Sequence, residues 1–89
     1  MSKLMNIGFG NVVNTDKIIS VLKADSAPAK RFIQNAKAGG TLLDATSGRK
    51  TKSLILTDSG HIILSALQPE TIMARFNGEP YDVRGEENE

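Results

Sequence analysis

The sequence predicts a small α+β domain in which about five antiparallel strands form one sheet and two short helices pack against it. Apolar runs of strand length, separated by turn residues, recur along the chain, and one stretch has the apolar spacing of a helix. The chain has 89 residues, the size of a single domain. A domain this small buries a modest core, so association between copies would stabilise it.

The first two strands are expected to form a hairpin. Residues 5–13 are interrupted by two glycines, which is typical of a bulged strand. Residues 14–16 are Asn-Thr-Asp, which favours a turn because Asn and Asp bond to nearby backbone. Residues 17–22 are rich in β-branched side chains and would return beside the first strand, with Lys17 next to the turn.

A helix is predicted to follow, from Ser26 to the glycine pair at 39–40. The Ser26 side chain can cap free backbone N–H groups, and Pro28 suits a first turn because its missing N–H is not needed there. The glycine pair ends the helix because glycine adopts the left-handed cap without strain. The apolar stripe of this helix consists of Ala29, Phe32, Ile33 and Ala36.

Three further strands are expected at residues 41–46, 53–57 and 61–67, joined by two hairpin turns. The first turn is the basic segment 48–52, and the second is Asp-Ser-Gly at 58–60. The last two strands are apolar on both faces. The two helices would cover one face, and the first hairpin or another subunit would cover the other.

A short second helix is expected to open at Gln68-Pro69, because proline suits a first turn. Its apolar side consists of Ile72, Met73 and Phe76. Both Phe32 and Phe76 are expected in the core.

Charge is unevenly distributed along the chain. The net charge is +1 at pH 7, but residues 17–52 hold eight Lys and Arg against two Asp, a net charge of +6. Residues 77–89 hold five acidic residues against one Arg, a net charge of −4. We therefore expect one basic domain at residues 1–76 and an acidic, disordered tail at residues 77–89. Such a domain suits a polyanionic partner.

The segment Gly48-Arg49-Lys50-Thr51-Lys52 places three cations in five residues. A turn of this kind is held out into solvent, and each cation that meets a phosphate releases condensed counterions. The alternative is an ordinary solvated loop, since charged turns are common on protein surfaces. The predicted phosphate contacts are Lys17, Arg49, Lys50 and Lys52. Lys30 and Arg31 are further candidates, with a solvated helix face as the equal alternative.

Composition and motifs disfavour several classes of protein. The chain has no cysteine and one histidine, which excludes thiolate and multi-histidine metal sites within one chain. It has no apolar run near the roughly 20 residues that span a bilayer and no apolar signal region, so we expect a cytoplasmic protein. The glycine-containing segments 8–11 and 46–51 lack the spacing and the following helix of nucleotide-binding loops.

The sequence predicts no enzyme, cofactor or small-molecule substrate. Residues 58–61 bring an Asp, a Ser and a His together, but a catalytic triad needs a pocket that a tight turn does not supply. Asp44 is expected to pair with Arg49 or Lys52 across the hairpin rather than to act in catalysis. Phe9, between two glycines, is expected at a contact between subunits.

Four blocks occur in a distinctive order: Asn-Ile-Gly-Phe-Gly-Asn at 6–11, Ser-Ala-Pro before Lys-Arg at 26–31, Leu-Asp-Ala-Thr with Gly-Arg-Lys-Thr at 43–51, and His-Ile-Ile-Leu-Ser-Ala with Gln-Pro-Glu-Thr at 61–71. With these blocks, residues 5–76 closely resemble the RemA family of bacterial extracellular matrix regulatory proteins.

This resemblance implies a transcriptional activator of biofilm-matrix genes that binds DNA and assembles into a closed homo-oligomeric ring. Double-stranded DNA would meet basic residues on the rim and wrap around the ring, which implies a protein associated with the nucleoid. The family's DNA-contacting positions correspond to Lys17, Arg49 and Lys50, and its prolyl position corresponds to Pro28. Lysine stands at 17 and 50 where arginine is usual, which keeps the charge but loses the planar fork.

Three hypotheses therefore remain: a ring-forming regulator on duplex DNA, an RNA-binding ring, and a structural or assembly protein whose cations only keep its rim soluble. Aromatic residues make up 4% of the chain, and this low share favours duplex DNA over single-stranded RNA.

Overall fold

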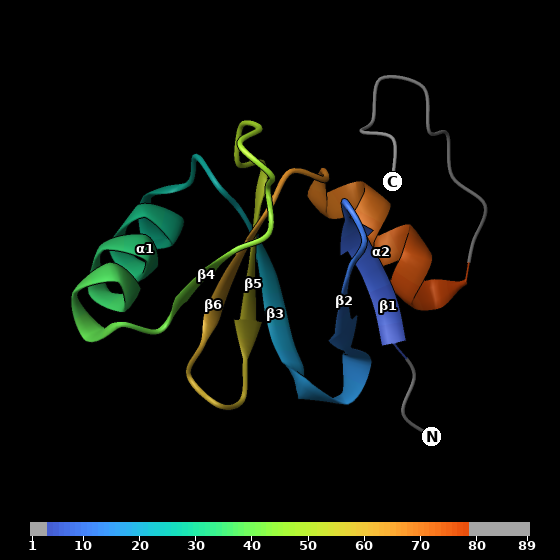
Figure 1. Ribbon diagram of the computed structural model, residues 1–89, viewed down its shortest axis with the longest axis horizontal. Coiled ribbons are helices and arrows are strands. Elements are labelled where there is room, and N and C mark those ends of the chain that lie inside the picture. The colour runs from blue at the N-terminus through green and yellow to red at the C-terminus, as the bar shows by residue number, and fades with distance from the viewer. Residues whose placement is uncertain (1–3, 79–89) are drawn as a thin grey trace.

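The computed structural model describes residues 4–78, which form six strands, one 3₁₀ turn and two helices (Figure 1). The strands are β1 (Leu4–Gly8), β2 (Asn11–Asn14), β3 (Ile18–Lys23), β4 (Leu42–Asp44), β5 (Ser53–Thr57) and β6 (Ile62–Ser65). The 3₁₀ turn and the helices are η1 (Thr15–Lys17), α1 (Ala27–Gly39) and α2 (Pro69–Asn77). The predicted α+β class is confirmed. Neither of the two described helices is long and apolar enough to cross a bilayer.

The strands form two sheets, whereas the sequence predicted one antiparallel sheet. The larger sheet has the order β3-β5-β6-β4, and β1 and β2 form a separate pair. The predicted hairpin across the basic segment is wrong, because β4 pairs with β6 in parallel and not with β5. The segment between β4 and β5 therefore crosses the end of the sheet. The hairpin predicted at residues 58–60 is confirmed, since β5 and β6 pair antiparallel.

The first hairpin also differs from the prediction. The chain reverses at Phe9–Gly10, so β1 pairs with β2 rather than with residues 17–22. Gly8, Phe9 and Gly10 have positive φ angles of 112°, 55° and 79°, which produce this tight reversal. The turn predicted at residues 14–16 is present, with the Asn14 side chain accepting a hydrogen bond from the backbone N–H of Asp16. It directs the chain from the small sheet into β3, which pairs with β5.

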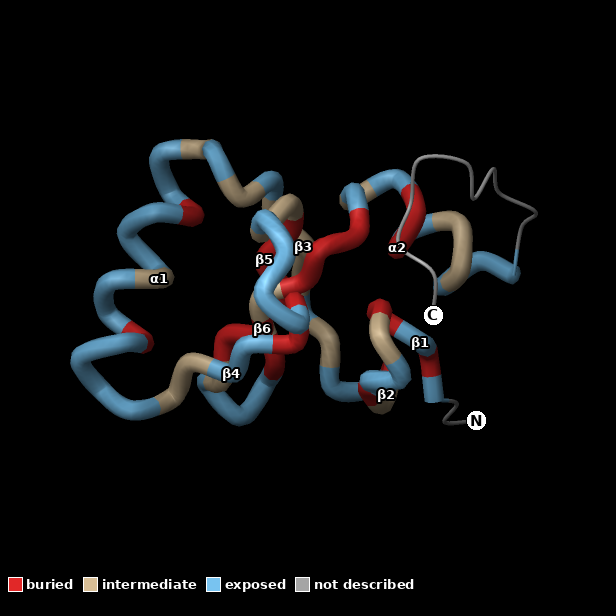
Figure 2. Tube along the Cα trace, turned by 45° about the horizontal axis from the view of Figure 1, so that its top comes forward, coloured by how far each residue is buried: buried red, intermediate tan, exposed pale blue. Residues whose placement is uncertain are grey.

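Both faces of the central strands β5 and β6 are buried, as their sequences predicted. Leu54 and Ile62 pack against α1, in a cluster with Ala29 and Ala36. On the opposite face, Ile55 belongs to a second cluster whose other buried members are Met5, Ile7, Val13, Ala45, Ile63, Leu67 and Ile72. The expectation that both helices cover one face is therefore wrong: α1 covers one face, and α2 covers the other together with the first hairpin. Figure 2 shows the buried residues gathered on β5, β6 and the chain leading to α2.

Two buried serines connect these layers. The Ser65 hydroxyl donates to the backbone carbonyl of Ile7 at 2.9 Å and accepts from the backbone N–H of Leu67 at 3.1 Å. The Ser53 hydroxyl donates to the carbonyl of Leu67. Because these groups are shielded from water, their hydrogen bonds fix the hairpin and the start of α2 against the central sheet.

Helix α1 begins and ends as its sequence predicted. The Ser26 hydroxyl accepts from the N–H of Ala29 at 3.3 Å, and Gly40 forms a left-handed cap with φ of 75°. The expectation that Phe32 and Phe76 are core residues is wrong, since they are 40% and 48% exposed. The small Ala29 and Ala36 face the sheet and let α1 approach closely, which leaves Phe32 at the margin of the contact.

The described residues reach only the beginning of the predicted acidic tail. Asn77 is the last residue of α2, and Gly78 caps the helix with φ of 73°. The rest of the tail, residues 79–89, lies outside the described residues, so its predicted disorder stays a prediction.

The Asp44 carboxylate, at the last residue of β4, is hydrogen-bonded to Thr46 in the segment that follows the strand. Asp44 Oδ1 accepts hydrogen bonds from the Thr46 N–H at 2.9 Å and the Thr46 hydroxyl at 2.6 Å. The sequence predicted that Asp44 pairs with Arg49 or Lys52 across a β4–β5 hairpin. That hairpin does not form, because β4 and β5 are not neighbours in the sheet. The hydroxyl and then the N–H of Thr46 hold the pKa of the Asp44 carboxyl below its usual range.

We expect Ser65→Ala to lower the free energy of unfolding by about 1–3 kcal/mol, because the Ile7 carbonyl and the Leu67 N–H lose their buried partner. Urea unfolding at matched protein concentration measures this change. Ser59→Ala is the control: it also removes a hydroxyl with hydrogen bonds, but in an exposed turn where water replaces them, so it should cost less than Ser65→Ala. Equal midpoints for Ser65→Ala and wild type would contradict the assigned role.

We expect the stability difference between wild type and Asp44→Ala to depend on pH. A carboxyl whose pKa is depressed in the folded state stabilises that state above its unfolded pKa, near 3.9. The contribution is lost as pH falls through the lower, folded pKa. Urea unfolding should therefore show wild type more stable at pH 7 by less than about 1 kcal/mol, because solvent screens the exposed carboxylate, and this difference should shrink as the pH falls below about 3.9. A difference that stays constant over this range would refute the interpretation.

Candidate nucleic-acid interface

The basic loop, residues 45–52, is anchored where it leaves β4 and where it enters β5. After the Asp44–Thr46 contact, the Arg49 N–H donates to the Thr46 carbonyl at 3.0 Å and closes a tight turn. Ser47 and Gly48 supply its left-handed backbone, with φ of 52° and 80°. At the other end, the Lys52 N–H donates to the Ser65 carbonyl at 2.9 Å. The loop thus holds Arg49 and Lys50 exposed at its crest.

Phe9 and Arg49 meet at the edge of this loop. The Arg49 guanidinium carbon lies 5.6 Å from the centre of the Phe9 ring, within the range of a cation–π contact. The Asn11 side-chain amide donates to the carbonyls of Gly8 at 3.1 Å and Ala45 at 3.4 Å, so the hairpin tip is also joined to the loop. The sequence did not predict this contact, because its partners lie on separate motifs. A subunit contact for the half-buried Phe9 stays a prediction.

Lys17 is separated from the basic loop within one subunit. It lies in η1, and its Nζ is 3.9 Å from Asp58 Oδ2, with both side chains more than half exposed. The β3–β5 pairing places Ile18 opposite Thr57, whereas Lys23 lies opposite Ser53 at the other end. Six residues of strand separate these ends, roughly 20 Å. Figure 1 shows η1 and the basic loop at opposite ends of the sheet.

Lys30 and Arg31 occupy the early turns of α1, and both are exposed. The start of α1 lies at the same end of the molecule as the basic loop (Figure 1). Pro28 is also exposed, in the first turn of α1, and lines a shallow hollow with Arg31 and Phe32. The predicted site residues other than Lys17 therefore lie at or beside one end of the sheet, Phe9 through its contact with Arg49.

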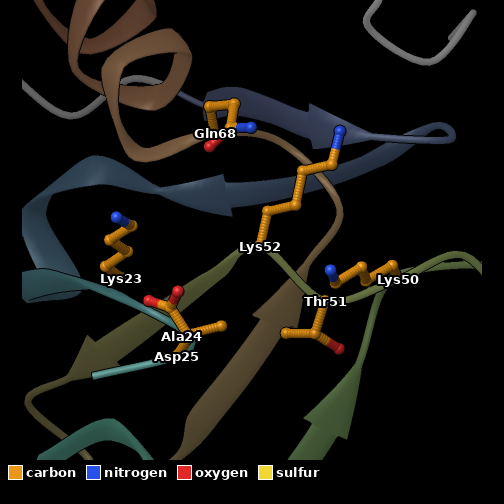
Figure 3. Close-up of a pocket in the computed structure, with 7 residues that line it drawn as sticks. All are labelled: Lys23, Ala24, Asp25, Lys50, Thr51, Lys52 and Gln68. Carbon is orange, nitrogen blue, oxygen red and sulfur yellow. The ribbon is translucent and has the colours of Figure 1, made fainter.

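Lys23 joins this basic end, although the sequence analysis did not select it. It lines a hollow together with Lys50 and Lys52, as Figure 3 shows. The wrong hairpin partner for residues 17–22 concealed this neighbour, because pairing with β5 is what places Lys23 opposite Ser53, next to Lys52. In the described residues, this end gathers six cations: Lys23, Lys30, Arg31, Arg49, Lys50 and Lys52.

The residues considered for catalysis lie in the turn between β5 and β6. Ser59 Oγ is 2.8 Å from His61 Nδ1 and 3.0 Å from Thr57 Oγ1, so the turn is held by its own hydroxyl and ring groups. Ser59 and Asp58 are exposed, and the Asp58 carboxylate faces Lys17. The arrangement serves to shape the turn.

Comparison with known proteins places these features in one family. A family model described as RemA-like, extracellular matrix regulatory protein A-like, matches residues 4–76. A "Putative regulatory protein" of Lachnoclostridium phytofermentans is 58% identical over 77 residues, covering 86% of this chain and 85% of the relative. Relatives with the same name are 57% identical in Dictyoglomus thermophilum (85% and 89% covered) and 55% identical in Thermotoga maritima (93% and 90% covered). The chain therefore belongs to the RemA-like family of regulatory proteins.

Proposed function

We propose that the protein is a transcriptional regulator that binds double-stranded DNA through the basic end of its sheet, and that it activates biofilm-matrix genes. The observation that carries this proposal is the anchored loop with Arg49 and Lys50 at its crest and Lys52 at its end, beside further cations from β3 and α1. Anchoring reduces the conformational freedom lost on binding. Long side chains on this fixed support can follow a phosphate backbone, which carries one charge per roughly 1.7 Å of duplex axis.

A closed ring would multiply this interaction. A single subunit offers few phosphate contacts, so its affinity for DNA at physiological salt would be low. Copies linked in one ring meet the same DNA at a high effective concentration, which raises the affinity without new contacts. Lysine at positions 17 and 50 supplies charge without a bidentate fork. This pattern favours wrapping and DNA deformability over base recognition.

The exposed apolar residues support assembly of subunits. A groove of about 270 Å³ between α1 and the central sheet is lined by Phe32, Leu56 and the 66% exposed Ile19. Apolar side chains are also exposed on the small sheet and α2, on the other side of the molecule: Leu4, Val12, Met73 and Phe76. Contact between two different faces is the geometry that closes a ring. In such a ring, Lys17 would reach the same DNA beside the basic end of a neighbouring subunit.

We expect Arg49→Ala with Lys50→Ala to abolish retention of duplex DNA in a gel shift while the molar mass by light scattering stays that of wild type. The plot of log K against log salt has a negative slope, and each lost phosphate contact makes it shallower by about one unit. Lys37→Ala, on the last turn of α1, is the control and should retain DNA. Retention by the double variant would rule out the assigned site. Competition that favours single-stranded RNA, or binding insensitive to salt, would favour the other two hypotheses.

We expect Ile19→Glu to lower the molar mass in solution, because a charge in the apolar groove would be buried by a neighbouring subunit. Light scattering measures the mass, and circular dichroism checks that the fold is intact. Gln34→Glu, on the exposed face of α1, adds the same charge outside the groove and should leave the mass unchanged. A wild-type protein that is monomeric at micromolar concentration would refute the ring.

A further inference from the structure

A cationic hollow lies where three elements meet at the basic end. Its volume is about 190 Å³. Figure 3 shows its lining at the end of β3 and the connection to α1, at the end of the basic loop, and at the residue before α2. The side chains that define its charge and polarity are Lys23, Asp25, Lys50, Thr51, Lys52 and Gln68.

Backbone hydrogen bonds hold the walls of this hollow in place. The Ala24 N–H donates to the Lys52 carbonyl at 3.1 Å, which joins the end of β3 to the start of β5. The Ser26 hydroxyl donates to the Lys23 carbonyl at 2.8 Å, and the Lys52 N–H donates to the Ser65 carbonyl. Lys23 and Lys52 therefore start from hydrogen-bonded backbone around one space, although they lie far apart in sequence. Lys50 lines the same space from the basic loop.

The lining suits a phosphate group. The lining holds three lysines and one carboxylate, that of Asp25, so its side chains carry two positive charges in excess. Within residues 4–78, no ion pair joins Lys23 or Lys50 to a carboxylate, so their charges are available to a ligand. Thr51 and Gln68 add a hydroxyl and an amide as neutral donors. The volume of about 190 Å³ leaves room for a phosphate group and its ester oxygens.

The start of α2 adds to the positive potential. Gln68 is the N-cap residue of this helix of nine residues, and its side chain makes no capping hydrogen bond. The positive end of the helix dipole therefore borders the same hollow as the three lysines, and Glu70 in the first turn of α2 offsets part of its potential. Charge from side chains and from the helix favours one kind of occupant, an anion.

We infer that this hollow seats a backbone phosphate of the bound DNA, with Lys23 as a phosphate contact in addition to those of the basic loop. The inference rests on the proposed function, because the phosphate belongs to the strand that meets Arg49 and Lys50 at the crest. The hollow extends the DNA interface from Arg49 and Lys50 of the basic loop to the junction of β3 and α1. Asp25 opposes the phosphate and weakens binding.

Two substitutions with opposite expected effects test this site. Lys23→Gln should weaken binding of random-sequence duplex. It should also make the slope of log K against log salt shallower by about one unit for each hollow that holds a phosphate. Asp25→Asn should tighten binding, because Asp25 is the only carboxylate that residues 4–78 contribute to the lining. Lys37→Gln removes the same charge as Lys23→Gln at the far end of α1, and it should leave the salt slope unchanged. Light scattering and circular dichroism confirm that each variant keeps its assembly and fold.

The outcomes distinguish failure of the hollow as a phosphate site from failure of the whole proposed DNA interface. The site is refuted if Lys23→Gln and Asp25→Asn bind like wild type while Arg49→Ala with Lys50→Ala loses DNA, and the proposed function then stands. Equal losses for Lys23→Gln and Lys37→Gln also refute it, because they reflect overall charge. If the Arg49 and Lys50 double variant still retains DNA, the proposed function itself fails.

Discussion

The two-sided burial of β5 and β6 is the constraint on which the rest of the structure depends. Leu54 and Ile55 are neighbours in sequence, but they point to opposite faces and both are fully buried. One layer cannot cover two faces, so α1 takes one while the first hairpin and α2 take the other. This division explains why β1 and β2 leave the main sheet, and why the buried hydroxyls of Ser53 and Ser65 bond to backbone in the covering layer.

The same constraint produces the basic end. With β5 and β6 at the centre, β3 and β4 occupy the edges, and β3, β4 and β6 all end where β5 begins. Three connections therefore converge at one end of the sheet, and each contributes polar or charged side chains: Lys23, the basic loop and Gln68. The opposite end holds η1 and the tight turn between β5 and β6, where Lys17 lies beside Asp58. The fold thus concentrates positive charge at one end.

Rigidity and charge have separate origins at this end. The loop is shaped by contacts of backbone and uncharged groups, apart from the Asp44 carboxylate that bonds to Thr46 at its entry. The Arg49 guanidinium adds a contact with the Phe9 ring, which joins the hairpin tip to the crest. Within residues 4–78, the side chains of Lys23 and Lys50 take no part in this scaffold, so a ligand can use their charges without breaking it. Such separation favours a nucleic-acid interface, where long cations adapt to phosphates above a fixed support.

Local chemistry let the sequence by itself determine the α+β class, both ends of α1, the turn at residues 58–60 and the charge of the basic loop. Each depends on residues near one another in the chain, such as Ser26 and Gly40 at the ends of one helix. The four sequence blocks also identified the family that the comparisons confirm. Only the tertiary structure decided that β4 runs parallel to β6, that β3 joins β5, and that Lys23 and Phe9 lie beside the basic loop. The physical reason is that alternation along a strand shows which faces are buried but does not specify the neighbouring strand, which is chosen by packing between distant segments.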